Sequence, residues 1–100
     1  MGLNVRLHAR ARADLAAIRD YLLATANPTA ADRVRQHLRE KILRLGEHPL
    51  IGITSTHPDI RILPPTLYPY RVYYVVTSTD VVVLHIRHTS RREPNVEELE

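Results

Sequence analysis

The sequence predicts an α+β fold in which two helices pack on one face of an antiparallel sheet. Three patterns support this. Apolar residues alternate with polar ones over 3–7, recur every three or four positions over 10–46, and alternate again over 60–88. A chain of 100 residues is long enough for one domain and too short for two. We therefore expect a single domain at 1–92 and an acidic C-terminal tail at 93–100.

The expected order begins with a strand and a helical hairpin. The alternation over 3–7 is typical of a half-buried strand. Over 10–26 the apolar residues take the spacing of an amphipathic helix, which Pro28 ends because proline disfavours helical backbone in the residue before it. A second helix is expected from Thr29, as its N-cap, to about Gly46. So short a connection predicts antiparallel helices.

A loop and three strands complete the prediction. Prolines and Gly52 mark the loop at 47–58. A short strand around 60–63 ends at two prolines, and two longer strands follow at 70–77 and 80–88. The polar turn between the longer strands predicts a hairpin, so these three strands should form an antiparallel meander.

Alternation also sorts the strand residues onto two faces of the sheet. The more apolar set is expected against the helices: Ile60, Ile62, Tyr70, Val72, Tyr74, Val76, Val82, Leu84 and Ile86. The open face is then expected to carry Arg61, Arg71, Tyr73, Val75, Val83, His85 and Arg87. Such a face can bind a polyanion or can simply stay hydrated, and a slip of one residue would exchange the two faces.

Charge is divided unevenly along the chain. Residues 1–92 carry a formal charge of +7, almost all of it from arginine, and residues 93–100 carry −4. A basic body indicates an acidic partner, either nucleic acid or an acidic protein segment, although arginine also serves simply to solvate helix faces.

Several classes of site are excluded or disfavoured by composition. The chain has no cysteine, which excludes disulfides, zinc–thiolate sites and a thiol nucleophile. The spacing of the six histidines matches no metal motif, and no glycine-rich phosphate loop is present, so we expect neither metal nor cofactor. No apolar run is long enough to span a bilayer and no signal peptide is evident, which predicts a cytoplasmic protein without membrane association.

Two motifs make the sequence resemble a known family. The stretch Tyr68-Pro69-Tyr70, followed by a strand that ends at His88 and Arg91, resembles the ParE branch of the RelE/ParE toxins of bacterial type II toxin–antitoxin pairs. The resemblance implies a RelE/ParE-like fold and a ParD-like antitoxin that neutralises the toxin in a hetero-oligomer. It also implies that the chain poisons DNA gyrase by binding it rather than as an enzyme, and that operator DNA is contacted only through the antitoxin.

Two alternatives remain open on the same fold. The RelE branch cleaves mRNA in the ribosome, and the candidate groups for that chemistry are Arg61, Arg71, Arg87, Tyr73, His85 and His88. RelE-type nucleases typically carry lysines and a late tyrosine. Here the only lysine is Lys41, on the second helix, and no tyrosine follows Tyr74, which favours gyrase poisoning. A relic that binds antitoxin without being toxic is the other alternative.

The resemblance also implies where the partners bind. Gyrase contact is expected at the end of the last strand and beyond it, at His88, Arg91 and Arg92. Apolar residues without an evident place in the core are candidates for antitoxin contact: Leu50, Ile51, Leu63 and Leu67. Each of these four can instead pack against the protein's own helices.

Overall fold

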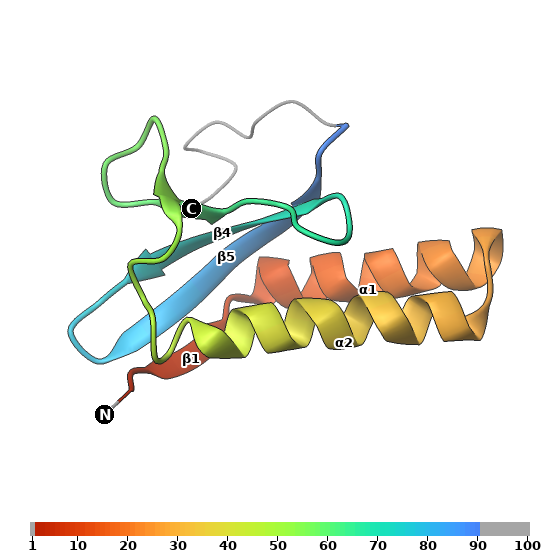
Figure 1. Cartoon of the computed structure of the whole chain (residues 1–100), viewed down its shortest axis with the longest axis horizontal. Coiled ribbons are helices and arrows are strands. Elements are labelled where there is room, and N and C mark those ends of the chain that lie inside the picture. Colours follow the sequence, from red (N-terminus) through yellow and green to blue (C-terminus); the bar gives the residue numbers. More distant parts are fainter. Residues whose placement is uncertain (1, 91–100) are drawn as a thin grey trace.

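Two antiparallel helices lie across one face of a five-stranded sheet in the computed structural model, which describes residues 2–90 (Figure 1). The predicted α+β fold and the helical hairpin are confirmed. In chain order the elements are β1 (Asn4–Leu7), α1 (Ala9–Thr25), α2 (Pro28–Arg44), β2 (Ile53–Thr54), β3 (Arg61–Leu63), β4 (Tyr70–Val76) and β5 (Asp80–His88).

The sheet has the strand order β1-β5-β4-β3-β2 and is mixed, so the expectation of a wholly antiparallel sheet is wrong at β1. Strands β3, β4 and β5 form the expected antiparallel meander, and β1 pairs in parallel with the first half of β5. Strand β2 lies inside the segment 47–58 that was expected to be a loop, so that expectation is wrong over two residues. A strand this short has no alternation of its own, and it is defined by its pairing with β3.

The second helix begins earlier than its sequence suggests. The Asn27 side chain accepts a hydrogen bond from the backbone N–H of Ala30 at 2.8 Å, so Asn27 is the N-cap, and the expectation that Thr29 fills this role is wrong. Pro28 occupies the first turn, where its missing N–H costs nothing and its fixed backbone angle suits a helix. This proline therefore starts the second helix as well as ending the first.

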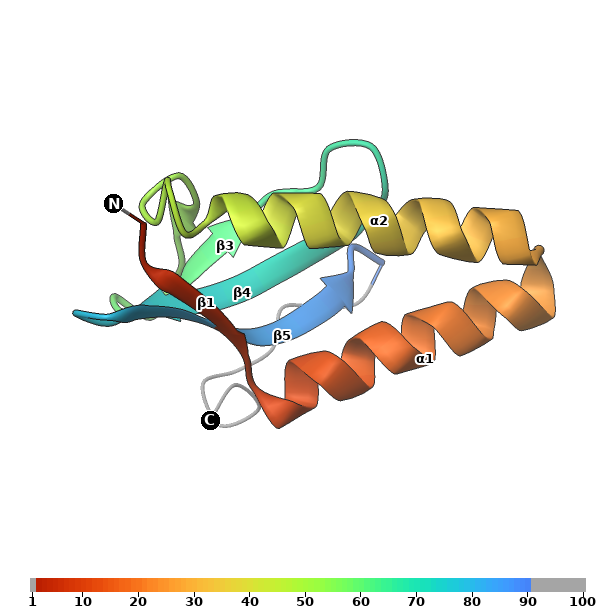
Figure 2. The ribbon, with the colours of Figure 1, turned by 90° about the horizontal axis from the view of Figure 1, so that it is seen from below.

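The main core lies between the helices and the sheet (Figure 2). Its buried members come from both layers: Ala11, Val34, Leu38, Ile42, Leu45, Leu63, Tyr70, Val72, Tyr74, Val81, Val83 and Ile86. A smaller cluster on the opposite face of the sheet contains Ile60, Ile62 and Tyr73. The placement of Ile60 and Ile62 against the helices is therefore wrong. Antiparallel pairing sets Ile62 opposite Tyr73, and the open face has an apolar cluster of its own.

An irregularity in β5 changes which of its residues face the helices. Tyr74 pairs with Val83 but the preceding Tyr73 pairs with His85, so Leu84 is an extra residue, as in a β-bulge. Before the bulge Val83 belongs to the main core, and after it Ile86 does. The expected faces are therefore correct for β4 and for the end of β5 but reversed for Val82, Val83 and Leu84, because a one-residue insertion inverts the alternation.

Candidate functional site

The end of β5 has no neighbouring strand on one side, and a carboxylate of α1 pairs with its backbone there. Strand β1 stops at Leu7, and the last backbone bond on this side runs from the His8 N–H to the Val83 carbonyl at 2.8 Å. Farther along β5, Asp14 on α1 accepts the Ile86 N–H through Oδ2 at 3.0 Å. A buried backbone N–H needs a partner, and here a side chain replaces the missing strand.

The same carboxylate oxygen binds His85, which is 3% exposed. On the other side of the ring, Nη1 of Arg87 lies 3.2 Å from Nε2 of His85. A guanidinium only donates, so Nε2 accepts, and the ring proton sits on Nδ1, from which it is donated to Asp14. Asp14, His85 and Arg87 thus form a hydrogen-bonded chain, called the relay below, that runs from α1 around the edge of the sheet. Arg10 completes it by pairing with the other oxygen of Asp14 at 3.5 Å.

A pocket of about 350 Å³ lies beside this relay, between α1 and the end of β5. His88 lines it and packs edge-to-face against Tyr70, with ring centroids 5.4 Å apart. Burial, and then the neighbouring Tyr21, raise the pKa of Tyr70, so its hydroxyl stays protonated. Of the three residues expected to contact gyrase, His88 thus lies in a pocket, whereas Arg91 and Arg92 lie outside the described residues, as does the tail at 93–100.

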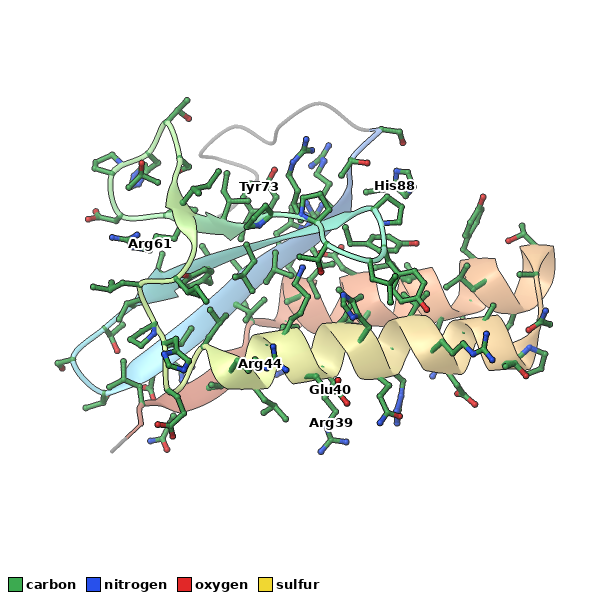
Figure 3. The ribbon with its side chains drawn as sticks, in the orientation of Figure 1. Arg39, Glu40, Arg44, Arg61, Tyr73 and His88 are labelled. Atoms are coloured by element: carbon green, nitrogen blue, oxygen red, sulfur yellow. The ribbon has the colours of Figure 1, made fainter. Side chains whose placement is uncertain are left out.

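The candidate nuclease groups are only partly brought together. Arg71 and Arg87 are directly opposite each other on β4 and β5, and the next pair on the same face of the sheet is Tyr73 with His85. Arg61 instead pairs with Tyr74, whose side chain points to the helices, so its assignment to the open face is wrong. In the view of Figure 3, Arg61 and His88 lie toward opposite ends of the sheet with Tyr73 between them.

Arg61 and Tyr74 fix the loop that precedes β2. The Tyr74 hydroxyl donates to the Pro49 carbonyl and accepts the Gly52 N–H, both at 2.8 Å, and Nη1 of Arg61 donates to the Gly52 carbonyl at 2.9 Å. Glycine is needed at position 52, because an added Cβ would lie 2.6 Å from the Tyr74 oxygen. Sequence reasoning missed this role of Tyr74, since it requires contacts across 22 and 25 residues of chain.

The fixed loop presents apolar side chains to solvent. Leu50 is 64% exposed and Ile51 61%, and Leu67, in the loop before β4, is 69% exposed. Leu63 is 7% exposed and packs in the main core, so its expected availability at the surface is wrong. Leu63 lies opposite Val72 in the β3–β4 pairing, and Val72 is fully buried in the main core, which accounts for the burial of Leu63.

A second hollow, of about 480 Å³, lies between β1 and the two helices. Its floor is apolar, with Leu15, Ile18, Leu38 and Ile42 among the lining residues. Four arginines also line it: Arg12, Arg19, Arg35 and Arg39. An apolar groove lined by cations fits an amphipathic segment that carries acidic residues.

Within residues 2–90, no group of three histidine, aspartate or glutamate side chains is placed to hold a metal ion. None of the helices in this part of the chain is long and apolar enough to cross a membrane. The only lysine, Lys41, donates from Nζ to the Pro64 carbonyl at 2.8 Å on the helix side of the molecule. Burial lowers the pKa of Lys41.

Comparison with known proteins gives a family match over most of the chain. The model of the ParE toxin of the type II toxin–antitoxin system parDE matches residues 5–93. Toxin RelE2 of Caulobacter vibrioides is 37% identical over 84 residues, which span 82% of this chain and 90% of that protein.

Solved structures share the fold. The chromosomal ParDE system from P. aeruginosa superposes with a TM-score of 0.78 at 24% identity, over 86% of this chain and 95% of that chain. The toxin–antitoxin complex RelBE2 from Mycobacterium tuberculosis gives 0.65 at 22% identity, over 88% and 99%. A free double mutant of the E. coli toxin RelE gives 0.62 at 21%, over 88% and 84%.

Proposed function

Because the chain belongs to the ParE toxin family of type II toxin–antitoxin systems, we propose that it is a toxin that inhibits DNA gyrase by binding it. The observation that carries this proposal is the arrangement of the candidate nuclease groups. A nuclease needs groups that are free to move protons and to neutralise the reacting phosphate together.

These groups are not arranged for such chemistry. Both ring nitrogens of His85 are engaged, one by Asp14 and the other by Arg87, so this histidine has no free position for a substrate proton. Arg61 is used to hold the loop at Gly52, and Lys41 lies on α2. The side chains therefore support binding better than phosphodiester cleavage.

The proposed gyrase contact is the end of β5 and the residues that follow it. His88 lines the pocket beside α1, and Arg91 and Arg92 continue the chain from there. Replacing Arg91 by alanine and deleting 93–100 should lower toxicity and leave antitoxin binding intact. The matched control is Arg44→Ala, which removes an exposed arginine from α2, away from this end of β5. Full toxicity of the first variant would place the gyrase contact elsewhere.

The proposed antitoxin is a ParD-like protein, and operator DNA is contacted through it. Its toxin-binding segment should combine apolar residues with acids, because the groove between β1 and the helices has an apolar floor and four arginines. Leu50, Ile51 and Leu67 are exposed and remain candidates for the same contact. The substitutions Arg35→Glu and Arg39→Glu should each weaken antitoxin binding, as measured by calorimetry.

A second candidate function is ribosome-dependent mRNA cleavage. It is favoured by the identity to a toxin named RelE2 and by the open-face neighbours Arg71, Arg87 and Tyr73. Cleavage of mRNA in the ribosome is the activity that the resemblance to RelE/ParE toxins implies for members of the RelE branch.

One induced culture without antitoxin separates the candidates. A DNA-damage reporter and plasmid supercoiling are followed together with the positions of mRNA 5′ ends. Damage signalling with intact messages, followed by inhibition of purified gyrase, is the expected result. Cut messages without damage would refute gyrase inhibition in favour of the nuclease. Normal growth with neither signal would indicate the remaining alternative, a relic that binds antitoxin without being toxic.

A further inference from the structure

The pocket between α1 and the end of β5 contains a tyrosine hydroxyl that makes no hydrogen bond within residues 2–90. This tyrosine is Tyr70, which is 7% exposed and has its ring in the main core. Burial, and then the neighbouring Tyr21, raise the pKa of Tyr70, and Tyr21 lines the same pocket, so the two hydroxyls lie on its side of the core. Because polar groups of buried side chains are almost always hydrogen-bonded, the Tyr70 hydroxyl indicates a bound group that accepts from it.

We propose that this pocket binds a carboxylate side chain of the glutamate type, presented by the target of the toxin. The identity of the partner rests on the proposed function, whereas the chemistry of the pocket rests on the residues that line it. The volume of about 350 Å³ is at the small end of the roughly 300–1,000 Å³ of ligand pockets, so it suits one side chain better than a cofactor.

Three side chains offer donors to the pocket. The raised pKa keeps the Tyr70 hydroxyl protonated. Nδ1 of His88 accepts the Ser90 N–H at 3.0 Å, so the proton of the neutral ring lies on Nε2. Arg10 is half exposed and faces Asp14 through Nε, and its terminal nitrogens make no hydrogen bond within residues 2–90. A carboxylate only accepts, and a charged acceptor makes hydrogen bonds about twice as strong as a neutral one.

The carboxylate already present in the pocket, that of Asp14, has its own partners. It accepts the Ile86 N–H at 3.0 Å, binds the ring of His85, and pairs with Arg10. These contacts compensate its charge on the side of the relay. The donors of Tyr70 and His88 are not among them, so a second carboxylate would meet groups that Asp14 does not use.

Apolar side chains favour a glutamate over a bare anion. Ala17 and Ile18 line the pocket from α1, and Tyr21, which is 62% exposed, stands at its mouth. The methylene groups of a glutamate can pack on these side chains, which an inorganic ion cannot do. The rings of Tyr70 and His88 pack edge-to-face with centroids 5.4 Å apart, so both donors are held in place before the ligand arrives.

Titration of the purified protein with N-acetylglutamate N-methylamide, followed by NMR of the tyrosine and histidine rings, tests the pocket. The signals of Tyr70 and His88 should shift and saturate. The glutamine analogue, which has a neutral amide in place of the carboxylate, should bind about tenfold more weakly. Tyr70→Phe should weaken binding of the glutamate probe about tenfold or more, as expected for loss of a hydrogen bond to a charged group.

Tyr68→Phe is the matched control, because this tyrosine packs against His37 outside the pocket, and the variant should bind the probe like the wild type. Thermal unfolding of both variants checks the fold, and Tyr70→Phe loses no hydrogen bond within residues 2–90. Equal affinity for the glutamate and glutamine probes, or unchanged probe binding by Tyr70→Phe, would overturn the proposal.

Binding of the same variants to purified gyrase tests whether the carboxylate belongs to the target. Tyr70→Phe should lower the affinity for gyrase about tenfold, and Tyr68→Phe should leave it unchanged. Loss of probe binding without loss of gyrase binding would overturn the assignment to the target and would indicate a free small carboxylate instead. If the wild type does not bind gyrase, the proposed function fails, and the probe titration still decides whether the pocket binds a carboxylate.

Discussion

Replacing Tyr74 with phenylalanine removes one hydroxyl that makes two interior hydrogen bonds. The side chain is fully buried, and its oxygen donates to the Pro49 carbonyl and accepts the N–H of the buried Gly52. Loss of the bond to the Pro49 carbonyl costs about 1 kcal/mol, and leaving the buried Gly52 N–H without a partner costs about 1–3 kcal/mol. The free energy of unfolding should therefore fall by about 2–4 kcal/mol, which for a chain of 100 residues lowers Tm by roughly 10 °C or more.

Urea unfolding followed by circular dichroism measures this loss directly, since the midpoint should fall while the slope stays constant. Tyr21→Phe is the matched control, because this tyrosine is 62% exposed on α1 and its loss should change stability by less than about 0.5 kcal/mol. Equal stability of the two variants would refute the reasoning, since it would mean that the Tyr74 hydroxyl does not hold the loop.

Two further predictions concern the pH dependence and the start of α2. Burial raises the pKa of Tyr70 and Tyr74 above 10.0, so the stability from their protonated hydroxyls is complete below that pH and is lost as pH rises through the folded pKa values. Unfolding in urea from pH 8 to 11 should show this loss, and Tyr70→Phe should reduce it. Asn27→Ala should cost about 1 kcal/mol by removing the N-cap, whereas Thr29→Ala should cost less than about 0.5 kcal/mol in the same assay. Equal losses would contradict the observed cap.

The sequence predicts those features of the fold that depend on neighbouring residues. Helical spacing and strand alternation are local, so both helices, β1 and the β3–β5 meander could be found from them. The parallel pairing of β1 with β5 joins residues 76 positions apart, such as Asn4 and Asp80, and nothing near either strand specifies it. Strand β2 has two residues and depends on the same kind of distant pairing.

The faces of the sheet were predictable for β4 and for the part of β5 that follows the bulge. Composition correctly placed Tyr70, Val72 and Tyr74 against the helices. The insertion at Leu84 then inverts the alternation in β5, and no residue around it marks the change, because valine, leucine and isoleucine suit either side. The position of Arg61 was missed for a related reason, since its face follows from pairing with Tyr74.

The candidate site was the hardest part to predict, because it arises from a difference in strand length. Strand β1 has four residues and β5 has nine, so the second half of β5 has no strand on its outer side. Its buried N–H at Ile86 still requires an acceptor, and a carboxylate on the adjacent helix can supply one. Once Asp14 is fixed for that purpose, the same oxygen also binds His85, and the ring in turn orients Arg87. The unpaired N–H at the edge of the sheet thus fixes Asp14, and Asp14 in turn fixes a buried histidine and an arginine. For this reason an aspartate in the first half of a surface helix is connected to the open face of the sheet.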